Sequence, residues 1–376
     1  MSDDLPELQA EALTVLRDQL DVLDKRLIET IAERQNVVAK IGEYKARSGH
    51  PTRDFKREKI LLNKARKIAL DAEVDPQLAV SVLKTLVRGS LQSQERARVQ
   101  SDGRGSGKSV LVVGGAGRMG GWFVDFFVSQ GFAVHVADPA ADQTLPNRFA
   151  DLEAAGTDYD IIVLATTLAL TADILQRFAA KPPRGLVFDV GSLKSPLKPA
   201  LRELAAAGVR VTSLHPMFGP ATQLLAGRQV IFIDVGDAEA TSQARALFAA
   251  TMATCIDMDI DEHDRLIAYV LGMSHMINIA FVDALAHSGV DARLMTKLSS
   301  PTFDAQRSMG QTVVSENPDL YYEIQKLNEF GDLPLDGLLR SVSKLRDAIA
   351  GDDQQAFVDA MRDGRRYLNS ATQPSH

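Results

Sequence analysis

The sequence contains a single cysteine, Cys255, in 376 residues. One thiol excludes internal disulfides and cysteine-cluster metal sites, and it is typical of a reducing compartment. Excess positive charge is also absent, because the formal net charge is −7, so the chain has no general attraction for nucleic acid or membranes. The acidic N-terminus lacks the apolar segment of a secretion signal, and we expect no apolar run of membrane-spanning length. These absences predict a cytoplasmic protein without a metal site.

The first helical region is too long for the domain that it opens. No proline interrupts residues 12–46, and a helix over them would be about 50 Å long, longer than a domain of about 100 residues is wide. We therefore expect a partner chain along part of its length, and hence a homodimer. Apolar residues recur in it at steps of four and three, the pattern of one buried face: Leu20, Leu23, Leu27, Ile31, Val38 and Ile41.

Two cations, Arg34 and Lys45, continue this apolar stripe. A buried cation without a partner is costly, so both positions predict contact with an anion. A single lysine or arginine more commonly extends from the edge of a stripe into solvent, and that explanation suffices for either residue alone.

Polar residues also replace apolar ones in the next two helical stretches. Together with three residues of the first helix, they form a set that resembles the active site of the all-helical chorismate mutases of bacterial bifunctional enzymes: Arg17, Arg34, Lys45, Asp54, Arg57, Glu58, Ser90 and Gln94. The resemblance covers residues 10–96 and includes the motifs A-E-R, G-E-Y-K, R-D-F-K-R-E and S-L-Q-S-Q.

This resemblance implies rearrangement of chorismate to prephenate, a single pericyclic step that needs no nucleophile, metal or cofactor. Arg17 of the partner subunit and Arg34 would hold the two carboxylates, with help from Ser90. Lys45 and Gln94 would donate hydrogen bonds to the breaking ether oxygen. Three further residues would line the pocket: Glu58, which accepts from the ring hydroxyl, and Asp54 and Arg57, which support the wall.

Length and composition, with 45% hydrophobic residues, predict two or three domains. Hydrophobic periodicity is lost over residues 92–108, and we interpret 101–108 as a linker between an all-helical domain (1–100) and an α/β Rossmann-type domain (109–258). From residue 259 to 376 the pattern is helical, which predicts an all-α substrate and dimerisation domain. Six apolar runs predict a parallel sheet covered on both faces: SVLVVGG, FAVHVAD, YDIIVLATT, GLVFDVGS, VRVTSLHP and QVIFIDV.

A glycine-rich motif follows the first of these runs. Gly115, Gly117 and Gly120 form G-x-G-x-x-G around Arg118 and Met119 and open a helix, whose N-terminus can hold a pyrophosphate. The motif alone is weak evidence, since glycines also mark ordinary turns. Asp138 at the end of the next strand can accept hydrogen bonds from a ribose and would repel a 2′-phosphate, which favours NAD over NADP, although an aspartate before Pro139 is also a common turn former.

Polar residues stand at later strand ends, where an open parallel sheet binds its ligand: Thr166, Ser192 and His215. His215 is the natural acid or base, because imidazole titrates near neutral pH. Its segment S-L-H-P-M-F-G-P, with D-V-G-S upstream, resembles the prephenate dehydrogenase family over residues 108 to about 365. The whole chain thus resembles the bifunctional chorismate mutase/prephenate dehydrogenase family.

For the second site the resemblance implies oxidative decarboxylation of prephenate to 4-hydroxyphenylpyruvate with NAD, in tyrosine biosynthesis. His215 would take the proton of the ring hydroxyl, and Ser192 would orient both. Of two further histidines, His275 would lie nearer the substrate, while His263 is interpreted as structural. Twelve residues separate these two, which argues against a shared metal ion.

One position departs from the family pattern. Thr312 stands six residues before Pro318, where the family usually has an arginine that grips the ring carboxylate, and Arg307 is the proposed substitute. An amino-substituted substrate, such as 4-amino-4-deoxyprephenate, is therefore an alternative. Another NAD(P)-dependent enzyme, such as a β-hydroxyacid dehydrogenase or imine reductase, would leave the polar residues of the first domain unexplained. A silent scaffold protein would tolerate the loss of His215, Lys45 or Gln94, and all three are present.

Overall fold

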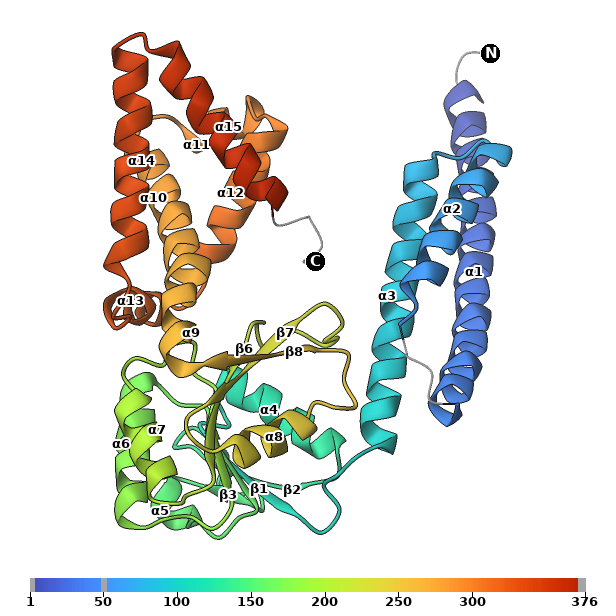
Figure 1. Cartoon of the computed structure of the whole chain (residues 1–376). Helices are drawn as coiled ribbons and strands as arrows, with labels where there is room; N and C mark the ends of the chain where they lie inside the picture. Colours follow the sequence, from blue (N-terminus) through green and yellow to red (C-terminus); the bar gives the residue numbers. More distant parts are fainter. Residues whose placement is uncertain (1–3, 49–52, 371–376) are drawn as a thin grey trace.

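The computed structural model describes residues 4–48 and 53–370. Its N-terminal part consists of helices α1 (Asp4–Arg47), α2 (Phe55–Asp71) and α3 (Pro76–Ser101) (Figure 1). Side chains of Asp54 and Asp75 accept backbone hydrogen bonds at the starts of α2 and α3, which fixes where these helices begin.

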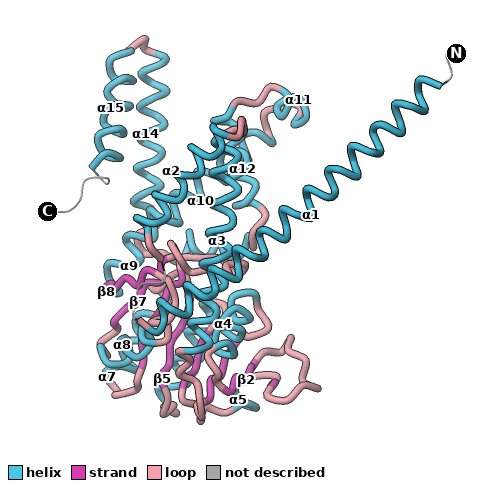
Figure 2. Tube along the Cα trace, turned by 90° about the vertical axis from the view of Figure 1, so that its right-hand side faces the viewer, coloured by secondary structure: helices cyan, strands magenta, loops and turns pink. Residues whose placement is uncertain are grey.

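Helix α1 extends as a rod beyond the other elements (Figure 2). Its 44 residues correspond to about 66 Å. The predicted apolar stripe is exposed within the single chain, with 55% of Leu20, 61% of Leu23 and 53% of Leu27 accessible to solvent. So large an apolar surface on a soluble helix is typical of a contact with another chain.

Helix α3 continues to Ser101, through residues where the hydrophobic periodicity of the sequence is lost. Residues 92–101 are helical and bury Glu95 and Val99. The periodicity is lost because Glu95 bonds to backbone groups of the neighbouring domain rather than packing in a core of its own. Beyond α3, Gly105 donates a backbone hydrogen bond to Gln130, so the connection is also attached to that domain.

Within the described residues, eight strands form one sheet in the order β3-β2-β1-β4-β5-β6-β7-β8. The strands are β1 (Ser109–Val113), β2 (Ala133–Ala137), β3 (Arg148–Phe149), β4 (Ile161–Leu164), β5 (Leu186–Asp189), β6 (Val211–Pro216), β7 (Gln229–Asp234) and β8 (Thr254–Asp259). The helices between them are α4 (Arg118–Ser129), α5 (Leu152–Ala155), α6 (Leu168–Ala180), α7 (Lys198–Ala206) and α8 (Ala238–Ala246). Apolar clusters bury both faces of the sheet, which confirms the predicted Rossmann-type class.

The sheet differs from the prediction at its edges. Strand β7 pairs with β6 in antiparallel orientation, so the prediction of an all-parallel sheet is wrong there. Residues 217–228 between them contain no helix, and without a crossover helix the chain returns beside the strand it has just left. The short β3 and the half-exposed β8 were not among the predicted runs, because neither has a continuous apolar pattern.

The C-terminal part is helical, as predicted. It consists of α9 (Ile260–Ile267), the π-helix η1 (Ala268–Met273), α10 (Ser274–Ala286), α11 (Ala292–Lys297), α12 (Pro301–Val314), α13 (Pro318–Lys326), α14 (Asp332–Ala350) and α15 (Gln354–Ser370). In Figure 1 the α14–α15 hairpin projects away from the sheet. Helices α9, η1 and α10 follow one another without a break and connect the sheet to this part.

The expectation that no apolar run has membrane-spanning length is wrong for residues 260–286. The continuous helical segment 260–286 is long and apolar enough to cross a membrane, with a mean hydropathy of 1.5 over its most apolar window and 22% of that window buried. Its first turn, however, carries Asp261 and Glu262, and α9 packs on strand β8. These features are those of a helix that begins on a folded domain and leaves an apolar surface for another protein segment.

Candidate active sites

The first site lies where α1 passes α3. Nη1 of Arg34 donates to Oγ of Ser90 at 2.9 Å, and this hydroxyl is also 3.1 Å from Oε1 of Gln35. One turn along both helices, Nε2 of Gln94 donates to the carbonyl oxygen of Val38 at 3.0 Å. The structure thus brings together Arg34, Ser90 and Gln94, which the sequence pattern had placed in the apolar stripes of two helices.

Lys45 lies close to these contacts along α1, and Arg17 does not. A methyl group at Gly42 would lie 3.0 Å from Cγ of Gln94, so the α1 backbone approaches Gln94 closely one turn before Lys45. Arg17 is exposed and precedes Arg34 by 17 positions on one helix, a rise of about 25 Å. Arg17 therefore cannot reach the Arg34 side chain of its own chain.

The residues at the start of α2 are placed differently. The side chain of Asp54 accepts from the backbone N–H of Arg57 at 2.9 Å, and Arg57 is exposed. Glu58 forms a paired ion bridge with Arg53, at 2.9 and 3.1 Å, a partner that the sequence analysis missed. Arg53 and Glu58 line a cavity of about 390 Å³ between α2, α3 and the loop that contains Arg228. Arg34 is not among the residues that line this cavity.

The second site begins at the glycine-rich turn between β1 and α4. Gly114 has φ +82°, and a Cβ on Gly120 would lie 2.0 Å from the Gly114 carbonyl oxygen, so only glycine fits at both positions. Gly117 is the N-cap of α4, which begins at Arg118. This close turn leaves the helix N-terminus open to an anion, the arrangement that a dinucleotide pyrophosphate requires.

Asp138 and Thr166 flank this turn. Asp138 follows β2 and accepts from the backbone N–H of Ala116 at 3.1 Å and of Ala140 at 2.8 Å, so its carboxylate is held at the turn. Thr166 follows β4, and a Cβ on Gly114 would lie 3.0 Å from its methyl group. Because β1 and β4 are neighbours at the point where the strand order reverses, the site lies where open α/β sheets bind ligands.

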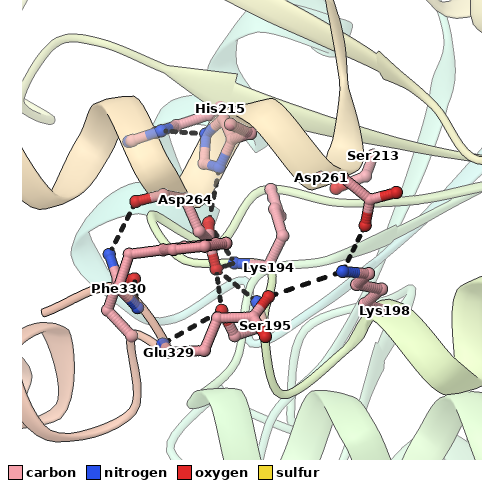
Figure 3. Close-up of polar contacts among 12 residues, drawn as sticks. Lys194, Ser195, Lys198, Ser213, His215, Asp261, Asp264, Glu329 and Phe330 are labelled. Atoms are coloured by element: carbon pink, nitrogen blue, oxygen red, sulfur yellow. Dashed lines mark hydrogen bonds and ion pairs between the residues drawn. The ribbon is translucent and has the colours of Figure 1, made fainter.

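The proposed base His215 is buried in strand β6 and begins a chain of hydrogen bonds (Figure 3). Its Nδ1 lies 2.9 Å from Nε2 of His263, and Nδ1 of His263 lies 2.6 Å from Oδ1 of Asp264. Both partners come from α9, where the sequence reads E-H-D. His263 was interpreted as structural, so its contact with His215 is a finding of the structure.

A buried lysine supports the same region. Lys194 is 0% exposed, and its Nζ donates to Oδ2 of Asp189 at 2.6 Å and to the Leu214 carbonyl oxygen at 2.9 Å. Oδ1 of Asp189 accepts from Oγ of Ser213 at 2.5 Å. Sequence reasoning missed this cluster, although Asp189 belongs to the D-V-G-S segment that it had singled out and Lys194 stands two residues after that segment.

Burial governs the charge states here. Burial lowers the pKa of His215 well below its usual value, and the neighbouring His263 and Lys194 lower it further. Burial also lowers the pKa of His263, against the opposing hydrogen bond of Asp264. The pKa of Lys194 is lowered by burial too, while Asp189 acts in the other direction. Two neutral imidazoles beside a buried ion pair are therefore the expected state at neutral pH.

The remaining candidate residues come from the loop after β5 and from helices α10 and α12. Ser192 is half-buried in the loop after β5. The His275 ring stacks on Tyr321 with centroids 4.2 Å apart, and its Nδ1 is one of two buried side-chain atoms without a partner among the described residues. Arg307 is exposed on α12, and its guanidinium lies 3.5 Å from the carboxylate of Asp304. On the same helix, the hydroxyl of Thr312 donates to the carbonyl oxygen of Ser308 at 3.0 Å.

Three family models match successive parts of the chain: chorismate mutase type II over residues 16–95, the nucleotide-binding domain of prephenate dehydrogenase over 138–256, and its dimerization domain over 259–363. The T-protein of Enterobacter agglomerans is 29% identical over 349 residues, which are 92% of this chain and 90% of that protein. This chain belongs to the T-protein family, in which a chorismate mutase is fused to a prephenate dehydrogenase.

Two other similarities cover the dehydrogenase part of this T-protein family member. The 4-amino-4-deoxyprephenate dehydrogenase of Streptomyces pristinaespiralis is 29% identical over 273 residues, 69% of this chain and 90% of that protein. The crystal structure of prephenate dehydrogenase from Aquifex aeolicus, with hydroxyphenyl propionate and NAD+, has a TM-score of 0.55 and 18% identity over 70% of this chain and 98% of that one. The second similarity supports the fold.

Proposed function

We propose that the chain catalyses two consecutive reactions: chorismate to prephenate at the α1–α3 site, and prephenate to 4-hydroxyphenylpyruvate and carbon dioxide at the sheet. The observation that supports this best is the presence of two separate polar sets. Arg34, Ser90 and Gln94 meet in the helical part, while His215 stands near the carboxyl end of β6, in the same sheet whose strand β1 leads into the glycine-rich turn.

At the first site, catalysis consists of holding a compact conformer and stabilising the charge that develops on the ether oxygen. Arg34, with Ser90, is placed to bind one carboxylate. Gln94 and Lys45 are placed to donate to the ether oxygen. Arg17 is too far along α1 to serve its own chain, which supports its proposed place in the pocket of the partner subunit.

Three residues at the start of α2 complete this proposal. Glu58 would accept from the ring hydroxyl once it turns from Arg53. Asp54 fixes the start of α2 through its cap, and the neighbouring Arg57 supports the wall.

NAD is the cofactor, and when bound it accepts the hydride. The residues present fit it: the turn formed by Gly115, Gly117 and Gly120 would hold the pyrophosphate with the backbone of Arg118 and Met119, and Asp138 would accept from the ribose hydroxyls. Thr166, across from this turn, would contact the cofactor from β4.

At the second site, the substrate loses a hydride from the carbon that bears the ring hydroxyl, and its O–H proton passes to His215. The resulting ring ketone favours cleavage of the bond between the ring and its carboxylate. The carboxylate leaves as carbon dioxide, and the electron pair of the broken bond makes the ring aromatic. The proton then returns from His215 to the phenolic oxygen, so no net proton is released. Ser192 would orient the hydroxyl. His275, whose buried Nδ1 finds no partner in the described part of the chain, would bind the substrate nearby.

Arg307 is the proposed clamp for the ring carboxylate, because the one ion pair that it forms with the described residues is a 3.5 Å contact with Asp304 on an exposed surface. The exposed apolar face of α1 and the matched dimerization domain support a homodimer, and the likeness to biosynthetic enzymes supports a place in the cytoplasm. We further propose domain boundaries at 1–100, 109–258 and 259–376, joined by 101–108.

Incubating the purified chain with chorismate tests this function directly. Mass spectrometry should detect prephenate without NAD, and 4-hydroxyphenylpyruvate with one NADH per carbon dioxide when NAD is added. Formation of prephenate that NAD leaves unchanged, while 4-amino-4-deoxyprephenate is oxidised, would instead favour the amino substrate suggested by the Streptomyces relative.

A further inference from the structure

Three residues form a linear, enclosed chain that ends at the proposed base. His215, His263 and Asp264 are 3%, 0% and 1% exposed, so bulk water cannot replace any of their partners. Nδ1 of His215 lies 2.9 Å from Nε2 of His263, and Nδ1 of His263 lies 2.6 Å from Oδ1 of Asp264. Each of these two contacts needs one donor and one acceptor, so the position of one hydrogen determines the next.

The carboxylate end of the chain sets the first hydrogen. Asp264 accepts from the backbone N–H of Lys194 at 2.9 Å, from Oγ of Ser195 at 2.5 Å, and from the backbone N–H of Ser195. Although burial opposes ionisation, hydrogen bonds from His263 and Ser195 lower the pKa of Asp264. An ionised carboxylate only accepts, so Nδ1 of His263 carries a hydrogen.

The remaining hydrogens follow in order. A neutral imidazole with its hydrogen on Nδ1 has a bare Nε2, so His263 accepts from His215 and Nδ1 of His215 is the donor. This leaves Nε2 of His215 bare. Among the described residues this nitrogen has no hydrogen-bond partner, and it is not one of the two fully enclosed nitrogens that lack one.

We propose that Asp264 and His263 are positioning residues that hold His215 in the one tautomer able to accept the substrate proton. This inference rests on the proposed dehydrogenase function and assigns roles that the sequence resemblance did not give. When Nε2 of His215 takes the proton, Nδ1 keeps its hydrogen bond to His263, and the charge of Asp264 offsets the new imidazolium through that ring. The positive charge of Lys194 disfavours the new imidazolium, and the negative charge of Asp189 offsets that of Lys194.

The sharpest test is Asp264→Asn in the full chain. The amide oxygen can still accept from the Lys194 and Ser195 backbone, but its NH₂ group faces His263 and donates to Nδ1. His263 must then donate to His215, which places the hydrogen of His215 on Nε2 and blocks the base. Dehydrogenase kcat should fall by roughly 10²- to 10⁴-fold with little change in the KM for prephenate, as for loss of a tautomer-fixing carboxylate in a protease triad.

Two further variants separate this role from simple packing. His263→Phe keeps a ring of similar shape but no nitrogen, and should also lower kcat rather than raise KM. Asn328→Ala is the matched control, because Asn328 donates to the backbone carbonyl of Asp264 at 2.9 Å and takes no part in the chain of tautomers. It should keep most of its kcat, and all three variants should keep the chorismate mutase activity of the wild type.

A direct readout comes from ¹⁵N-labelled histidine, since ring nitrogen shifts distinguish bare from hydrogen-bearing positions. Wild-type His215, assigned by its disappearance in His215→Asn, should have a bare Nε2, and Asp264→Asn should exchange the two positions. A hydrogen on Nε2 of wild-type His215, unchanged kcat in His263→Phe, or an equal loss in Asn328→Ala would overturn the proposal. Wild-type protein that does not oxidise prephenate with NAD but has a bare Nε2 on His215 would refute the dehydrogenase function and leave the tautomer assignment standing.

Discussion

The side chains of Arg34 and Ser90 meet between α1 and α3, Gln94 bonds to the α1 backbone one turn further on, and His215 is buried near the end of β6. Helical phase and strand ends determine which of these side chains face inward, and their catalytic roles stay predictions. The sequence could not show that His263 contacts His215, since 48 positions separate them and only the packing of α9 beside the sheet brings them together.

The buried imidazoles predict a pH dependence of stability. In the folded chain, the pKa values of His215 and His263 lie below the ordinary value of 6.5. At a pH between the folded-state and the unfolded-state pKa, the unfolded chain binds more protons than the folded chain, so folding weakens as the pH falls. The free energy of unfolding, measured in urea, should therefore decrease as the pH is lowered from about 7.5 toward 5. In His263→Phe this decrease should be smaller; an unchanged slope would show that His263 is protonated equally in both states.

Arg307 gives a second prediction at this scale. If it grips the ring carboxylate, Arg307→Ala should raise the KM for prephenate roughly tenfold or more, the effect of losing a charged hydrogen bond, with kcat little changed. Thr312→Arg, which restores the family residue, should leave or improve this KM. An unchanged KM in Arg307→Ala would mark it as a solvated helix residue.

Elements were predicted well where apolar patterns are continuous and poorly where partners come from another domain. Six strands were found from apolar runs, while the antiparallel β6–β7 pair and the last turns of α3 were not. Glu95 illustrates the reason: its carboxylate accepts from the backbone N–H groups of Leu225 at 2.8 Å and Met252 at 2.5 Å, 130 and 157 positions away.

Glu95 therefore attaches α3 to the dehydrogenase part. Glu95→Ala should lower the free energy of unfolding by about 2 kcal/mol or more, because two backbone N–H groups lose their acceptor. Denaturant unfolding of this variant should be compared with Arg96→Ala, an exposed neighbour on the same helix. Equal stability of the two variants would mean that the contact contributes nothing to domain attachment.

At the scale of the whole molecule, the length of α1 and its exposed apolar face are the features behind the proposed homodimer. Mixing Arg17→Ala chains with Arg34→Ala chains should restore part of the mutase activity, since some heterodimers would have one pocket with both arginines. Subunit exchange should be followed by mass in the same samples. Complete exchange without any rescue would place Arg17 in the pocket of its own chain, against the distance along α1.

The central claim is that one chain carries two independent active sites, and product analysis of two variants tests it most directly. With chorismate and NAD, Lys45→Ala should form at least roughly 10²-fold less prephenate, as loss of a fixed electrostatic donor does, yet oxidise supplied prephenate at the wild-type rate. His215→Asn should accumulate prephenate from chorismate and produce almost no 4-hydroxyphenylpyruvate. Loss of both activities in either folded variant would contradict the account.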